Sequence, residues 1–375
     1  MERTQTWDQL LTQAATGPYV SLYLPLSDHT EMAAVQLEIR HLSAHAQAVM
    51  AKTYPECDWA PYAAQLAQLA DTPQRSVGQT VQGLGVLCTP ESLLTFDLQE
   101  PVNSVAMVTA QPQILPLIAD AQRHQAFDVL VLQSDKIALL QATKGTLTPT
   151  PLPESAPQTL IGTLGDEVRG GGLNSVSQGR GQVSYHGHGD KANSDATDMR
   201  RFFQAVDEYI MAQYSQPHQQ PLALWGLSQT LAVFRDLSRN PWLLDVQLEV
   251  SPEPLDAAAC ARAAVTLQQD LATQRQHHLL TVIDQARSAN RLVTDLGAVL
   301  QANAAGAIAH LLLADTGRIN GRLVDGALET TGDKAQHNNL LNDLAVATMQ
   351  QGGQVTVLPA AQLSAPVVAL TRYQL

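Results

Sequence analysis

Residues 127–140 read FDVLVLQSDKIALL and decide the fold of the middle of the chain. Val129–Leu132 and Ile137–Leu140 are continuous apolar runs, separated by the polar residues Gln133–Lys136. A strand that is buried on both faces has a continuous apolar sequence instead of an alternating one. Two such runs with a short polar connection are typical of a hairpin, so we expect a hairpin of buried strands here.

The residues downstream continue an α/β pattern. Leu222–Gly226 predicts another buried strand, and a helix is expected from about 229 to 237. A helix before that strand is expected to begin at a cap formed by Ser194 or Asp195. Its apolar face comprises Met199, Phe202, Phe203, Val206, Tyr209 and Ile210. Strands that alternate with helices imply a sheet covered by helices.

The two flanks also predict mixed α/β structure. Before the hairpin we expect strands at 20–25, 85–87, 93–96 and 104–108, with a helix of about twenty residues from Met32. After position 245 we expect helices at 256–289 and 336–350, and strands at 310–314, 354–358 and 367–370. The sequence therefore predicts three α/β domains, at 1–115, 116–245 and 246–375.

Composition and charge limit the function classes. The chain has 375 residues, of which 45% are hydrophobic and 15% charged, as in globular proteins. Its 22 Lys and Arg residues against 35 Asp and Glu give a formal charge of -13, so contact with RNA needs a local basic patch, and no DNA partner is expected. Residues 1–5 have no signal-peptide pattern, and no apolar stretch is long enough to span a membrane, so we expect a cytoplasmic protein. The separated Cys57, Cys88 and Cys260 predict reduced thiols.

Residues 162–194 are rich in Gly, Ser, Asn, Asp and His and predict a long mobile loop, of a length that is often functional. Basic residues in and beside it could form a cluster that faces RNA phosphates: Arg169, Arg180, Lys191, Arg200 and Arg201. Acidic neighbours leave open a solvated face of mixed charge. The loop has no GxxxxGK[ST] motif, and we expect no cofactor.

Two hydrolase interpretations stay open. Gly226-Leu227-Ser228-Gln229-Thr230 follows a strand, as a nucleophile elbow does, but lacks the second glycine, which favours Ser228 as a helix N-cap. A serine hydrolase would need His310 or His337 to complete its triad. His186, His188 and Asp190 alternate, so on an extended strand they would share a face as weak metal candidates. The loop offers no strong fourth ligand.

The order of these features resembles the bacterial archaeo-eukaryotic release factor family, bacterial relatives of the class 1 release factor of eukaryotes and archaea and of Pelota. The segments that carry the resemblance are the hairpin 127–140, the loop ending HGHG at 186–189, the helix from Arg201, and PLALWG at 221–226. The resemblance implies an RNase H-like middle domain and an L7Ae-like last domain. It also implies a translation factor for ribosome rescue, hibernation or peptide release, which binds at the tRNA site and contacts rRNA and peptidyl-tRNA.

The family's eukaryotic factors carry a Gly-Gly-Gln tripeptide in the middle-domain loop, where the Gln positions water against the peptidyl-tRNA ester. The only literal copy here, Gly352-Gly353-Gln354, falls between a predicted helix and a predicted strand, where glycine is expected for capping. The loop has Gly179-Arg180-Gly181-Gln182 instead. By resemblance, Gly181 and Gln182 are the catalytic candidates and Arg180 contacts RNA. A binding factor without catalysis is the alternative.

Overall fold

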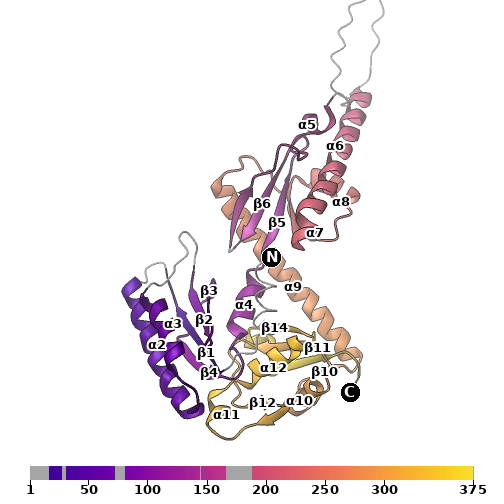
Figure 1. The fold of residues 1–375 in the computed structure, drawn as a ribbon. Coiled ribbons are helices and arrows are strands. Elements are labelled where there is room, and N and C mark those ends of the chain that lie inside the picture. Colours follow the sequence, from indigo (N-terminus) through magenta and orange to yellow (C-terminus); the bar gives the residue numbers. More distant parts are fainter. Residues whose placement is uncertain (1–16, 28–30, 72–80, 144, 166–187, 375) are drawn as a thin grey trace, which may run out of the picture. The chain divides into compact units, whose positions relative to one another are not determined.

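The computed structural model describes residues 17–27, 31–71, 81–143, 145–165 and 188–374, with side chains described from 195 onward in the last range. The described chain forms two compact units (Figure 1). Unit 1 comprises residues up to 124 and from 277 onward, and unit 2 comprises 125–276. The predicted boundary after 245 lies inside a strand, and the division into three domains stays a prediction.

The sheet of unit 2 has five strands in the order β7-β6-β5-β8-β9. Their bounds are β5 Phe127–Leu132, β6 Ile137–Thr143, β7 Thr146–Thr150, β8 Leu222–Gly226 and β9 Leu243–Leu248. β5, β6 and β7 are antiparallel, with Leu130 opposite Leu139, whereas β5, β8 and β9 are parallel, with Leu130 opposite Leu224. The predicted hairpin and the buried strand after it are confirmed.

Helices cover both faces of this sheet, which explains the continuous apolar run of β5. Phe127, Val129 and Val131 pack on α9 (Ala257–Ser288), whose residues up to 276 belong to unit 2. Leu130 and Leu132 pack on the opposite side, against α6 and α8. The bounds on that side are α5 Leu160–Leu164, α6 His188–Ile210, the π-helical turn η2 Met211–Ser215, α7 Gln216–His218 and α8 Ser228–Leu237. The predicted apolar face of α6 is confirmed, since Phe202, Phe203, Val206 and Ile210 are fully buried and Met199 and Tyr209 pack beside them.

The first part of unit 1 is an antiparallel sheet in the order β3-β2-β1-β4. Its strands are β1 Tyr19–Pro25, β2 Gly83–Cys88, β3 Leu93–Leu98 and β4 Val105–Thr109. Val20, Leu22 and Leu24 face α2 (Met32–Thr53) and α3 (Ala60–Asp71), while Tyr23 packs in the core on the other face. This is the two-residue alternation of a strand with a different core on each face.

The second part of unit 1 is a sheet in the order β10-β15-β11-β14, with a separate hairpin β12-β13. The strands are β10 Leu292–Val293, β11 Ile308–Ala314, β12 Arg322–Val324, β13 Ala327–Glu329, β14 Gln354–Leu358 and β15 Val367–Thr371. The helices are α4 Leu115–Arg123, α10 Leu296–Ala304, α11 Asp333–His337 and α12 Leu340–Gln350, with the 3-10 turn η3 at Ala360–Gln362. One hydrophobic core joins Tyr23 and Leu87 of the first sheet to α4, β11 and α12.

Several local expectations are corrected. α6 begins at His188 and not at Ser194 or Asp195, because Lys191 and Ala192 favour helix and the exposed Asp195 is tolerated inside it. Positions 160–164, partly assigned to the loop, are helical. The single helix expected at 336–350 is two helices, which Asn338 and Asn339 separate. Cys57, Cys88 and Cys260 are free thiols, as predicted.

Among the described helices, none combines the length and the apolar character that a membrane crossing requires.

Candidate functional site

The carboxyl ends of β5, β8 and β9 meet at one edge of the unit 2 sheet, which we call the carboxyl edge. It comprises Gln133, Leu227, Ser228 and Glu249, the residues that follow these strands. α5 begins at the same edge, because the Leu160 amide donates to the Asp135 carbonyl at 2.8 Å. α5 also packs against α6 (Figure 1). Ligands of open sheets with parallel strands bind at such an edge, and segment 166–187 connects the two helices that lie here.

A chain of hydrogen bonds crosses the carboxyl edge. The Ser228 hydroxyl donates to Glu249 Oε2 at 2.6 Å, Gln247 Nε2 donates to Glu249 Oε1 at 2.7 Å, and Arg235 Nε donates to Gln247 Oε1 at 2.6 Å. The bond from Ser228, with the Gln247 bond and the charge of Arg235, lowers the pKa of the Glu249 carboxyl. Glu249 is therefore a stable carboxylate and a poor proton acceptor.

Ser228 is not the N-cap that the sequence predicts. Leu227 occupies the cap position in extended conformation, and Ser228 is the first helical residue of α8. Its hydroxyl is thus oriented toward Glu249, on β9's continuation, and not toward its own helix. The prediction is wrong by one position, because Leu227 and not Ser228 has the extended backbone of a cap residue.

The geometry around Ser228 does not form a nucleophilic triad from described residues. Among the described side chains of unit 2, the only imidazole is that of His218, which precedes β8 while Ser228 follows it. Five residues of strand separate them by about 16 Å. The other two candidates are engaged inside unit 1: His310 Nε2 lies 2.7 Å from Thr356 Oγ1, and His337 Nδ1 lies 2.8 Å from the Asp333 carbonyl.

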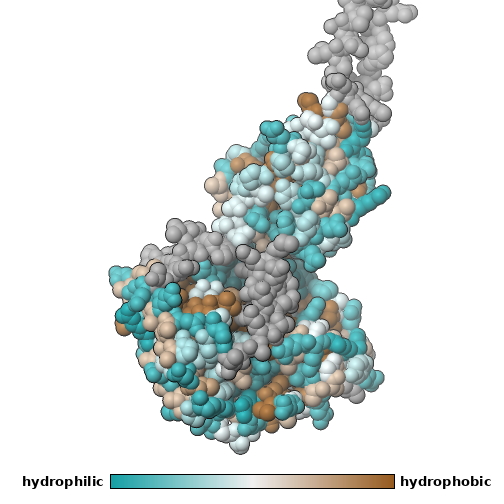
Figure 2. Space-filling model, in the orientation of Figure 1, coloured by the Kyte–Doolittle hydropathy of each residue, from teal (hydrophilic) through white to brown (hydrophobic). Residues whose placement is uncertain are grey.

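Two of the five predicted RNA-binding residues have described side chains, and both have carboxylate partners. Arg200 pairs with Asp236 of α8 at 2.6 Å, and Arg201 lies 3.9 Å from Asp198, whose side chain is 2% exposed. Hydrophilic residues cover most of α6 and α8 on the face that Figure 2 shows. The described part of α6 is therefore a surface of mixed charge.

The other members of this set lie in or next to 166–187. Arg169 and Arg180 fall outside the described residues, and Lys191 is in α6 with its side chain outside them. The catalytic candidates Gly181 and Gln182 also fall outside them, so both assignments stay predictions.

The metal interpretation of His186, His188 and Asp190 stays a prediction. It assumed an extended strand, whereas His188 and Asp190 lie in α6 with their side chains outside the described residues. His186 lies outside the described residues. Within the part of the chain that the structure describes, no group of three His, Cys, Asp or Glu residues is placed to hold a metal ion.

Gly352-Gly353-Gln354 connects α12 to β14, as predicted for a helix terminus. Gly352 has φ +73°, a conformation that favours glycine, and its amide donates to the Met349 carbonyl at 3.0 Å. A Cβ on Gly353 would lie 2.9 Å from the Ile308 carbonyl oxygen. Both glycines therefore have structural roles at this connection.

Asp128 is a buried carboxyl that the sequence analysis missed. It lies at the start of β5, is 4% exposed, and accepts a hydrogen bond from Gln220 Nε2 at 2.9 Å. Burial raises the pKa of this carboxyl to about 7. An Asp before an apolar run is the sequence signal, but only the neighbouring β8 connection shows that the side chain is buried.

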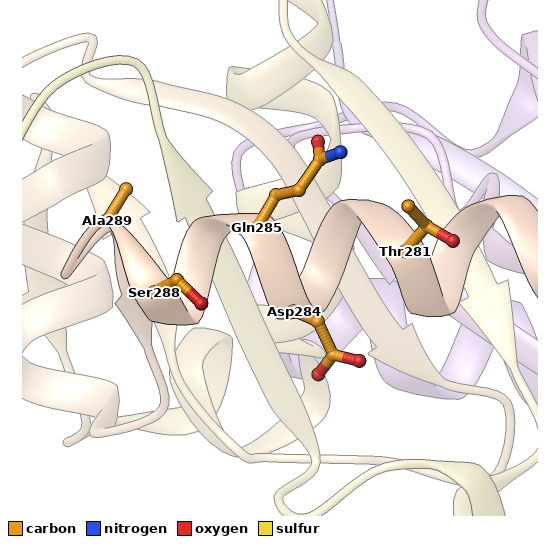
Figure 3. A pocket seen from close by; sticks show the side chains of 5 residues that line it. All are labelled: Thr281, Asp284, Gln285, Ser288 and Ala289. Carbon is orange, nitrogen blue, oxygen red and sulfur yellow. The ribbon is translucent and has the colours of Figure 1, made fainter.

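A hollow of about 540 Å³ lies in unit 1 beside the last turns of α9. Its lining residues come from that helix and from the residue that follows it: Thr281, Asp284, Gln285, Ser288 and Ala289 (Figure 3). Asp284 is already paired with Arg287 at 2.7 Å. Described groups from one helix alone do not converge on a ligand, so this hollow is not the functional site.

Comparison with known proteins relates unit 2 to release factors. Residues 125–270 match the model of bacterial archaeo-eukaryotic release factor family 6. Comparison with curated proteins gives no match.

Comparison with solved structures gives matches at low identity, including these three. The archaeal translation termination factor aRF1 is 13% identical, with 99% of this chain and 97% of that chain covered and a TM-score of 0.24. Dom34 of S. cerevisiae, a translation termination-like factor, is 13% identical, with 78% and 80% covered and a TM-score of 0.37. Ribosome-bound archaeal Pelota is 10% identical, with 99% and 94% covered and a TM-score of 0.38.

The family resemblance read from the sequence is confirmed for residues 125–270, which match the model of bacterial archaeo-eukaryotic release factor family 6.

Proposed function

We propose that this protein is a ribosome-associated translation factor that acts in rescue, hibernation or peptide release and binds at the tRNA site. The observation that carries the proposal is the match of residues 125–270 to a release factor family. This segment contains the sheet of unit 2, its carboxyl edge and the segment 166–187. The partners in this proposal are rRNA and, for a release role, peptidyl-tRNA.

The proposed architecture is an RNase H-like middle domain and an L7Ae-like last domain. The strand order β7-β6-β5-β8-β9, antiparallel up to β5 and parallel beyond it, supports the first assignment, as do the helices on both faces. The mixed sheet of β10, β11, β14 and β15 is compatible with the second.

The contacts with RNA are assigned to the basic residues near segment 166–187. Arg200 and Arg201 have carboxylate partners, so a phosphate must compete with Asp236 and Asp198 for them. Arg169, Arg180 and Lys191 are then the main candidates, on a chain whose formal charge is -13. Binding through so few cations loses less affinity with rising salt than binding through a wide basic face.

Two roles remain within this function, and the proposal favours binding without hydrolysis. Arg180 stands where the tripeptide has its first glycine, and a side chain there restricts the backbone that the tripeptide needs. Among the described residues of the carboxyl edge, Glu249 is a poor proton acceptor, because hydrogen bonds from Ser228 and Gln247 lower its pKa. Hydrolysis of peptidyl-tRNA through Gly181 and Gln182 is the second candidate, which the retained Gly-Gln pair supports.

A release assay separates the two roles. Ribosomes that carry a labelled peptidyl-tRNA are incubated with wild-type protein, Gln182→Ala and the matched control Gln178→Ala from the same segment. For a binding factor, all three proteins bind equally and none releases peptide above the rate without factor. Release by wild type that falls at least about tenfold in Gln182→Ala, with Gln178→Ala unchanged, would establish hydrolysis, because a lost positioning group raises the barrier.

A further inference from the structure

A pocket of about 420 Å³ lies in unit 1, between α2, β4 and the residues around α11, whereas the segment used in the proposed function belongs to unit 2. α11 packs against both α2 and β4 (Figure 1). The volume falls in the lower part of the range of about 300–1,000 Å³ that small-molecule sites occupy. We call it the α2 pocket.

The floor of the α2 pocket is apolar. Leu42 and Val49 of α2 and Ala106 and Val108 of β4 line it, and all four are buried. They present hydrocarbon to the pocket, so a flat or cyclic apolar group of a ligand loses little by leaving water here.

The rim of the α2 pocket carries basic side chains. His41 and His45 lie four positions apart, on one face of α2. Arg318 follows β11, and His337 ends α11. The side chains of Arg318 and His45 have no hydrogen bond or ion pair with any described residue, so an anion would not have to displace a carboxylate from them.

Glu38 is the one acidic residue on the rim, and its charge is partly engaged. Ser104 Oγ donates to Glu38 Oε1, and Glu38 Oε2 lies 4.0 Å from His41 Nδ1. With neutral imidazoles the lining has no net charge, since Arg318 balances Glu38. With all three imidazoles protonated it carries about three positive charges.

His337 illustrates how protonation changes what the rim binds. A carbonyl oxygen only accepts, so His337 Nδ1 donates to the Asp333 carbonyl at 2.8 Å. In the neutral ring Nε2 is then an acceptor and cannot hold a phosphate oxygen. In the protonated ring it becomes a charged donor, the stronger type of partner for an anion.

We propose that the α2 pocket binds a small molecule of about mononucleotide size, whose ring lies on the apolar floor and whose phosphate is held by Arg318 and the protonated imidazoles. Protonation of an imidazole adds a charged donor to the rim, so binding is stronger at pH 6 than at pH 8. Glu38, His41, His45, Arg318 and His337 are the charged and titratable groups that line the pocket.

The test is calorimetric titration of the full-length protein with adenosine 5′-monophosphate, adenosine and inorganic phosphate at pH 6 and pH 8, at constant ionic strength. The variants are Arg318→Gln and the double change His41→Gln with His45→Gln. The control is Arg40→Gln, an exposed cation of α2 outside the pocket that pairs with Asp71. Because the phosphate itself gains a proton near pH 6, the double variant isolates the contribution of the imidazoles.

We expect wild type to bind the monophosphate about tenfold more tightly than adenosine at pH 6, and to lose about tenfold in affinity at pH 8. Arg318→Gln weakens binding about tenfold at pH 6, the scale of a lost charge-assisted hydrogen bond. The double variant loses most of the pH effect, and Arg40→Gln matches wild type.

Equal binding of adenosine and the monophosphate, or an unchanged affinity in Arg318→Gln, overturns the proposal. Titration with a single-stranded RNA oligomer distinguishes a small-molecule site from an RNA contact. If the oligomer binds through Arg318 while the monophosphate does not, the pocket is an RNA contact and the small-ligand proposal is wrong. Thermal unfolding of each variant verifies that unit 1 remains folded.

Discussion

Asp128 is a carboxyl group enclosed on the face of β5 that α6 and α8 cover. Only one side-chain hydrogen bond, from Gln220, compensates its loss of water, and burial raises its pKa to about 7. In the unfolded chain an aspartate titrates near its ordinary value of about 4. The folded state therefore holds a proton between about pH 4 and pH 7 that the unfolded state has released.

This difference predicts a specific pH dependence. Since the folded state binds more protons in that window, the free energy of unfolding of unit 2 falls as the pH rises from about 4 to 7, and the contribution is fully lost above 7. Asp128→Asn keeps an oxygen for Gln220 and removes the titration. As the pH rises from 5 to 8, we expect the free energy of unfolding of the variant to increase by about 2 kcal/mol relative to that of wild type. Denaturant unfolding at each pH measures this difference.

The control for this experiment is Asp135→Asn, an exposed carboxyl after the same strand. It should follow the wild-type profile at each pH. If the free energies of unfolding of wild type and Asp128→Asn change in parallel with pH across this range, Asp128 does not hold a proton in the folded protein.

Residue-scale features were the hardest to predict from sequence. The Ser228 side chain was assigned to its own helix because local sequence cannot show that Glu249, 21 positions away, supplies an acceptor. Arg200 and Arg201 were grouped by proximity in sequence, and their partners Asp236 and Asp198 became visible only in the fold. The type and spacing of isolated polar residues can be read from the sequence, but their roles depend on neighbours from distant elements.

At the scale of elements, Asn342 of α12 connects the two parts of unit 1. It is fully buried, its Nδ2 donates to the Pro112 carbonyl at 2.8 Å, and its Oδ1 accepts from the Ile114 amide at 2.7 Å. Within the second part, Gln122 joins α4 to β14, with its Nε2 donating to the Val355 carbonyl at 2.6 Å and its Oε1 accepting from the Val357 amide at 3.0 Å. Unit 1 is thus held together by polar contacts as well as by its shared core.

We expect Asn342→Ala to destabilise unit 1 by about 2–4 kcal/mol, because it leaves two buried backbone groups without partners. Chemical denaturation monitored by tryptophan fluorescence and by hydrogen exchange measures the loss. Gln301→Ala, an exposed change in α10, is the control and should alter stability by less than about 0.5 kcal/mol. If the variant loses protection from hydrogen exchange in α12 alone, with β1–β4 unchanged, unit 1 does not unfold as one cooperative unit.

Element types were predicted best where the apolar pattern is long and regular. The runs of β5 and β6, the stripe of α2 and the length of α9 gave the correct elements because each faces a large core. α3 and α4 were missed, although Tyr62, Leu66 and Leu69 follow a helical spacing, because they are short helices. The start of α6 was misplaced because polar residues fit the exposed surface of a helix as well as a loop.

For the whole molecule, the family match covers residues 125–270, which include the five strands of the unit 2 sheet. In the proposed function, the acidic balance of the chain restricts contact with the ribosome to a few basic residues. Sequence alone also indicated this family, because the order of hairpin, Gly-rich segment, helix and strand carries more information than any single motif. The site residues Gly181 and Gln182 remain predictions on that basis.

The most direct test of the central claim is co-sedimentation of the full-length protein with intact 70S ribosomes at about 150 mM salt, where nonspecific charge attraction is strongly screened. We predict saturable, stoichiometric binding that decreases when Arg169, Arg180 and Lys191 are changed together to Gln and that stays unchanged in Arg318→Gln. Protein that remains in the supernatant with both empty and stalled ribosomes would contradict the claim that this chain is a ribosome-associated translation factor.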